Sequence, residues 1–147
     1  MATITKFGKV GEKFADKEID FLADQIKVFF LKSSYTPNFD THEYQTSLDL
    51  ANNEIGTTST YTKGTGLVLA NKTGTYIDGS DYTSFDADDL TVEDATIPDF
   101  RYAAIVDTQS ANEATNPLIA LIDYESTVAL VAQQLKLKWN ASGIFAI

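Results

Sequence analysis

The stretch Leu130-Val-Ala-Gln-Gln-Leu-Lys-Leu-Lys-Trp139 has the most regular pattern in the chain. Within it three apolar residues alternate with three polar ones, namely Leu135, Leu137 and Trp139 with Gln134, Lys136 and Lys138. Successive side chains of a β-strand point to opposite faces, so this period of two predicts a strand with one face in a core and the other in water.

Shorter runs rich in β-branched and aromatic residues precede this strand, and turn residues separate them. We expect strands at residues 25–32, 67–70, 73–77, 82–86, 101–106 and 118–122, with a further alternating segment at 90–93. Both faces of 25–32 are mostly apolar, which predicts a central or covered strand. Asp78-Gly79 lies between two of these runs and predicts a hairpin with a type I′ turn.

These strands predict a mainly β fold, either an antiparallel β-sandwich or a flattened barrel of about seven or eight strands. A chain of 147 residues can bury roughly 70% of its unfolded surface, which suffices for one core. We therefore expect an N-terminal arm or short helix over residues 1–22 and a single β-sandwich domain over residues 23–147.

The N-terminal segment has a different pattern. Ile4, Phe7, Val10 and Phe14 recur at spacings of three and four, as on one face of a helix. Two glycines in the segment each weaken a helix by about 1 kcal/mol, so we expect a short helix or irregular arm over residues 5–15. Its lysines, at positions 6, 9, 13 and 17, would face acidic groups on a partner or on residues 78–99.

Charge excludes several classes of partner. The chain has 11 Lys and Arg against 21 Asp and Glu, which gives a formal net charge of −10. Nucleic acids and anionic membranes repel such a chain, so we expect neither as a partner. No apolar run reaches the length of a membrane helix. The chain has no cysteine, which excludes disulfides and thiolate metal sites.

Carboxylates gather between residues 78 and 99, where no lysine or arginine interrupts them. The favoured interpretation is a solvated face with turns, and calcium binding is the alternative. The candidate calcium ligands are Asp78, Asp81, Asp86, Asp88 and Asp89. They do not match the EF-hand pattern, so we expect no metal and no cofactor.

The sequence offers little for catalysis. His42 is the only histidine, with Ser33, Ser34 and Asp40 nearby in the chain, but no nucleophile motif surrounds them. We interpret His42 as part of a loop network and expect that the protein is not an enzyme.

Several motifs occur in a set order along the chain from residue 26 onward. They are Ile26-Lys-Val-Phe-Phe-Leu-Lys-Ser-Ser-Tyr-Thr-Pro-Asn-Phe-Asp-Thr-His-Glu-Tyr44; Phe85-Asp-Ala-Asp-Asp-Leu-Thr91 with Ala95-Thr-Ile97 and Arg101-Tyr-Ala-Ala-Ile-Val106; Pro117-Leu-Ile119 with Ile122-Asp123; and Lys138-Trp-Asn-Ala-Ser-Gly-Ile-Phe145. Together they resemble a family of small virion structural proteins of tailed bacteriophages. The chain departs from that pattern at Glu54–Thr65 and at Glu93. These departures concern the shape of the local loops and not the expected fold.

The resemblance implies a capsid-associated structural protein without catalytic residues. We expect a capsid decoration or cement protein that braces subunits of the major capsid protein on the virion surface, after assembly in the host cytoplasm. Decoration proteins commonly occupy local three-fold axes, which implies a homotrimer. The expected capsid contacts are Ile4, Phe7, Val10 and Phe14.

Two alternatives remain open. One is a neck or tail structural component of the virion. The other is a carbohydrate- or calcium-binding module on the virion surface. For the N-terminal segment, ordering on a neighbouring protein and covering the chain's own sandwich are equally compatible with the sequence. We expect residues 2–22 to contribute more to attachment than to folding.

Overall fold

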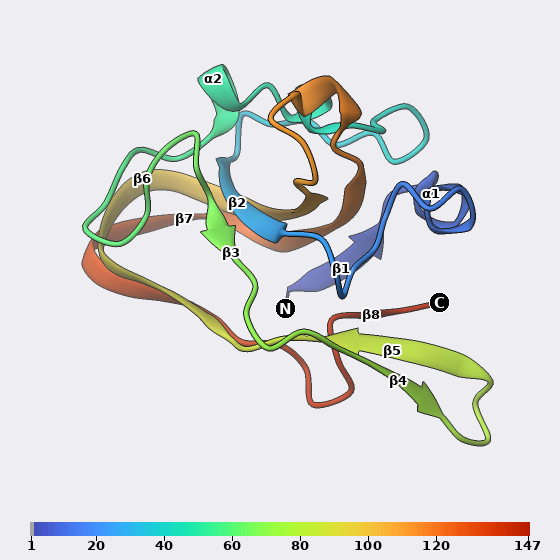
Figure 1. The fold of residues 1–147 in the computed structure, drawn as a ribbon. Helices are drawn as coiled ribbons and strands as arrows, with labels where there is room; N and C mark the ends of the chain where they lie inside the picture. Colours follow the sequence, from blue (N-terminus) through green and yellow to red (C-terminus); the bar gives the residue numbers. More distant parts are fainter. Residues whose placement is uncertain (1) are drawn as a thin grey trace.

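The structure is a computed structural model that describes residues 2–147, and two antiparallel sheets dominate it (Figure 1). The larger sheet has five strands in the order β1-β7-β6-β2-β3, and the smaller has three in the order β4-β5-β8. The strands are β1 (Thr3–Lys6), β2 (Ile26–Lys32), β3 (Leu67–Val68), β4 (Thr73–Ile77), β5 (Tyr82–Asp86), β6 (Leu90–Asp107), β7 (Leu118–Leu137) and β8 (Phe145–Ala146). The helical segments are α1 (Val10–Ala15), α2 (Leu50–Asn53) and the 3-10 turns η1 (Gln45–Leu48) and η2 (Glu113–Thr115).

This arrangement confirms the expected mainly β fold and its strand number for the described residues. The molecule is sandwich-like, and the strand order within each sheet does not close into a barrel. The alternation at Leu135 and Leu137 is also confirmed, because both side chains are buried while Lys136 between them is exposed.

A long hairpin of β6 and β7 joins the two sheets. Its register runs from Leu90 opposite Leu137 to Val106 opposite Leu118. Several register shifts interrupt the pairing between Val92 and Tyr102. Such bulges bend a strand and increase its twist. In Figure 1 the hairpin accordingly curves out of the five-stranded sheet and returns toward the three-stranded one.

The sequence predicted this hairpin as four separate strands, and that prediction was wrong in its boundaries. Residues 94–99 and 123–129 are largely polar and break the period of two, so they did not resemble strands. They nevertheless pair, because the bulges absorb the irregular register. The left-handed backbone of Asp94 and Ala132, with φ of 50° and 47°, marks these irregularities.

The β4–β5 hairpin is confirmed, since Thr73 pairs with Asp86 and Ile77 with Tyr82. Its turn differs from the expectation. The loop spans the four residues 78–81, and the positive φ values belong to Gly79 (78°) and Asp81 (54°). The two-residue type I′ turn predicted from Asp78-Gly79 is therefore absent from this hairpin.

The five-stranded sheet is covered on both faces, as the apolar faces of β2 predicted. Ile26, Val28 and Phe30 of β2 belong to a core cluster with Phe145 of the small sheet. The intervening Phe29 and Leu31 belong to a second cluster, which includes Phe7, Tyr35, Leu48, Leu50, Tyr102, Leu118 and Leu121. The loops around α2 therefore cover the face opposite the small sheet (Figure 1).

The N-terminal segment is part of this sandwich. Residues 3–6 form β1, which pairs antiparallel with β7 from Thr3 opposite Asp123 to Lys6 opposite Ala120. The helix is limited to α1, so the expected helical face over residues 5–15 was wrong at its start. Ile4 remains 39% exposed.

The expected capsid contacts need a correction on the same ground. Phe7 is 1% exposed and Val10 is 5% exposed, and each belongs to one of the two core clusters. Phe14 packs on Phe85, with ring centroids 5.5 Å apart. Phe7 and Val10 therefore serve the chain's own core, and the interpretation in which this segment covers its own sandwich is favoured over a separate arm at 1–22.

A chain that lacks residues 2–22 is therefore expected to lose cooperative unfolding in urea.

A milder test compares Phe7→Ala with Ile4→Ala, because the two residues lie three apart but differ in burial. We expect Phe7→Ala to lower the free energy of unfolding by about 3–5 kcal/mol, as for other buried phenylalanines. Ile4→Ala should lower it by about 1 kcal/mol or less. Equal effects, or a stable truncated chain, would contradict this placement.

Candidate functional site

The five calcium candidates Asp78, Asp81, Asp86, Asp88 and Asp89 do not converge on one point. Among residues 2–147 no group of three or more acidic or histidine side chains is arranged to hold a metal ion. Asp88 accepts a hydrogen bond from the side-chain amide of Asn71 at 2.6 Å, and Asp89 accepts one from the backbone N–H of Trp139 at 2.9 Å. Asp88 and Asp89 therefore hold the segments at Asn71 and Trp139, and the geometry does not support the calcium hypothesis.

His42 lies in a loop network, as expected. Its Nδ1 lies 2.7 Å from the hydroxyl of Tyr35 and 3.4 Å from the backbone nitrogen of Asn38. Partial burial lowers the pKa of the His42 imidazole. Ser34, a neighbour in sequence, donates to Asn53 instead.

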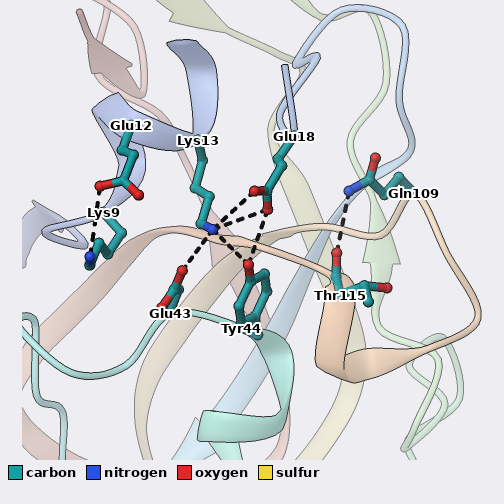
Figure 2. A network of polar contacts seen from close by, with 8 residues as sticks. All are labelled: Lys9, Glu12, Lys13, Glu18, Glu43, Tyr44, Gln109 and Thr115. Carbon is teal, nitrogen blue, oxygen red and sulfur yellow. Dashed lines mark hydrogen bonds and ion pairs between the residues drawn. The ribbon is translucent and has the colours of Figure 1, made fainter. Parts of the chain in front are cut away.

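A buried lysine ties the N-terminal segment to the rest of the domain (Figure 2). The Lys13 side chain is 5% exposed, and its Nζ lies 2.6 Å from Glu43 Oε1 and 3.1 Å from Glu18 Oε2. It also donates to the hydroxyl of Tyr44 at 2.6 Å. Burial disfavours the ammonium ion, but the hydrogen bonds to Glu43, Tyr44 and Glu18 outweigh it and raise the pKa of Lys13.

This cluster corrects the expectation for Lys13, which was that it would face a partner or residues 78–99. Its partners come from the turn after α1 and from the loop before η1, and no sequence period connects them. The bond to Lys13 is also the main reason why the pKa of Glu43 is lowered. The arrangement therefore fixes the position of α1.

A buried carboxylate, Glu54, shapes the loop of residues 54–64. Glu54 is 1% exposed and accepts hydrogen bonds from the hydroxyl of Tyr61 and from the backbone N–H of Gly64. Tyr61 also accepts from the backbone N–H of Phe30 in β2. Burial raises the pKa of Glu54, which these hydrogen bonds partly offset. This carboxylate therefore holds the loop 54–64 on the sheet.

A third polar site lies at the end of β6. Asp107 is fully buried, and its Oδ2 accepts a hydrogen bond of 3.2 Å from the backbone N–H of Asp20. Asp24 Oδ2 accepts from the same N–H, also at 3.2 Å. Asp107 Oδ1 has no partner among the described residues. Burial, followed by the neighbouring Asp24, raises the pKa of Asp107 to about 7.

A groove borders β1 and has a volume of about 580 Å³. Its apolar lining comes from strands and from the C-terminal segment and consists of Ile4, Ile122, Leu137, Trp139 and Ile144. Lys136 and Lys138 also line it, and no carboxylate does. The hydroxyl of Tyr124, another lining residue, is buried and has no hydrogen-bond partner among the described residues.

Sequence reasoning missed this groove. Ile122 and Leu137 belong to the same strand, and a straight strand of that length would separate them by about 50 Å. They line one groove because β7 bends. The alternation of Leu137 and Trp139 with Lys136 and Lys138 was the visible signal, but it fitted an ordinary amphipathic strand equally well.

Comparison of the chain with models of protein families, with curated proteins and with solved structures found no match in any of the three. The described helices are also too short and polar to cross a membrane.

Replacing Lys13 with methionine should destabilise the domain, because Glu18 and Glu43 would keep their charges without the shared ammonium group. We expect the free energy of unfolding at pH 7 to fall by about 2–4 kcal/mol in urea titrations. Lys9→Met is the matched control, since Lys9 forms an exposed pair with Glu12 at 3.7 Å that contributes less than about 1 kcal/mol. Equal losses in the two variants would show that the buried cluster does not stabilise α1.

Asp107 should make stability depend on pH. Its folded-state pKa of about 7 lies above the ordinary unfolded value, so the folded chain binds more protons between about pH 4 and pH 7. The free energy of unfolding should therefore fall as pH rises through this window.

Asp107→Asn should remove that dependence. In urea unfolding, the stability of the variant relative to the wild type should increase between pH 5 and pH 8 by at most about 3 kcal/mol. The exposed Asp40→Asn serves as the control and should parallel the wild type. A constant difference between Asp107→Asn and the wild type across this range would contradict the assignment.

Proposed function

We propose that this protein is a structural component of a tailed-bacteriophage virion, and specifically a capsid decoration or cement protein. The observation that carries the proposal is the ordered set of motifs between residues 26 and 145 that resembles a family of such proteins. No enzymatic activity is part of the proposal.

The position of these motifs in the fold supports it. Ile26–Lys32 is β2, Arg101–Val106 lies in β6, and the motif at 117–123 begins β7. These are adjacent strands of the five-stranded sheet. The resemblance therefore covers the central strands of the domain, where sequence is constrained by packing over both faces, and it is not confined to loops.

The charge of the chain supports a docking role. A formal net charge of −10 complements basic patches on a capsid shell and favours association through electrostatic steering. In this proposal the protein forms a homotrimer at local three-fold axes on the outer surface of the shell. It contacts the major capsid protein without covalent bonds, after assembly in the host cytoplasm.

Copy number tests the proposal against a neck or tail component. Purified virions of the phage that encodes this chain should contain hundreds of copies by gel densitometry against the major capsid protein. The reason is that a decoration site repeats with the capsid lattice. About a dozen copies would favour the neck or tail, where one ring suffices. Absence of the chain from virions would overturn a structural role.

A further inference from the structure

We infer that the groove beside β1 receives an extended, carboxylate-bearing segment of the capsid shell protein, which adds as a strand to the free edge of β1. This inference rests on the proposed function, because it names the contact through which the chain would attach. The argument has three steps, namely a free strand edge, an apolar lining and a local positive charge.

The free edge belongs to β1, the outermost strand of the five-stranded sheet. All four of its residues are exposed, and β7 is its only partner strand among the described residues. Backbone N–H and C=O groups on the other side of β1 are therefore available to an added strand, which is a recurring mode of peptide recognition.

The lining of the groove suits the side chains of such a strand. Ile4 in β1 is 39% exposed and borders the groove, whose lining includes Leu137 and Trp139. A strand presents every second side chain to the same face, so alternate residues of the incoming segment can enter the groove. Leu137 and Trp139 are already buried, so the apolar surface that such a segment would cover is mainly that of Ile4. The backbone pairing sets the register.

Charge selects the kind of segment. Lys136 and Lys138 are exposed and line the groove, although the chain as a whole has a net charge of −10. Asp123, which pairs with Thr3 beside the groove, is engaged by Arg101 through hydrogen bonds of 2.9 and 3.0 Å. The local field therefore favours carboxylates.

The remaining long edge does not offer the same chemistry. β4 (Thr73–Ile77) is the outer strand of the small sheet and is largely exposed. Its turn carries Asp78 and Asp81, and Asp86 lies opposite Thr73 in β5, so carboxylates surround that edge. An acidic segment would be repelled there, which leaves the edge of β1 as the favoured site.

The test measures binding of the full chain to empty capsids assembled from the shell protein of the same phage. The variant Lys136→Glu/Lys138→Glu reverses the charge of the groove, and Ile4→Asp places a charge in its apolar lining. The matched control Lys17→Glu/Lys63→Glu makes the same change in net charge at exposed lysines outside the groove. Cooperative unfolding of each variant is checked first.

We expect both groove variants to bind at least tenfold more weakly than the wild type, and the control to bind within about threefold of it. If the wild type binds and the groove variants bind equally well, the inference is wrong while the decoration role stands. If the wild type does not bind the capsids, the decoration role fails and the inference fails with it.

Photo-crosslinking identifies the occupant. A photoreactive phenylalanine analogue at position 4, in chain bound to capsids, should crosslink to an acidic extended segment of the shell protein, as read by mass spectrometry. A crosslink to a second copy of this chain, or to a basic segment, would overturn the assignment of the occupant. Because Ile4 is partly exposed, this substitution should leave the fold intact.

Discussion

The bend in the β6–β7 hairpin is the constraint on which the rest of the structure depends. One end of the hairpin pairs within the five-stranded sheet, and the other brings Trp139 to Asp88 and Asp89 beside the small sheet. Without the bulges between Val92 and Tyr102, two strands of this length would run straight past the core. The bend therefore places the two sheets face to face and creates the groove beside β1.

The N-terminal segment supplies core side chains to both faces of the five-stranded sheet. Phe7 enters the cluster beneath the α2 loops, whereas Val10 enters the cluster between the sheets. Lys13 then fixes α1 to the loop at Glu43 and Tyr44. Because one segment supplies both clusters, folding and ordering of the N-terminus are coupled, and a separate arm is not needed to explain its apolar residues.

Charge is distributed unevenly over the molecule. The excess of carboxylates gathers around the β4–β5 hairpin and the start of β6, while Lys136 and Lys138 border the groove. A net charge of this size makes copies of the chain repel one another, and the two lysines give the groove the opposite local charge. The buried carboxylates Glu54 and Asp107 instead accept hydrogen bonds from backbone N–H groups in the chain's own loops.

The sequence by itself determined the local elements: the strand at β2 with two apolar faces, the β4–β5 hairpin and the alternation through Leu135 and Leu137. These depend on periods of two and on turn residues, which are local properties. Only the tertiary structure decided that the four strands expected between residues 90 and 139 form two long strands, β6 and β7. The bulges allow the polar residues between the expected strands to pair as well. The tertiary structure also decided that Phe7 and Val10 are core, that Lys13 meets Glu43, and that Ile122 and Leu137 share a groove. Each of these contacts joins residues far apart along the chain, and no local period encodes the bend that brings them together.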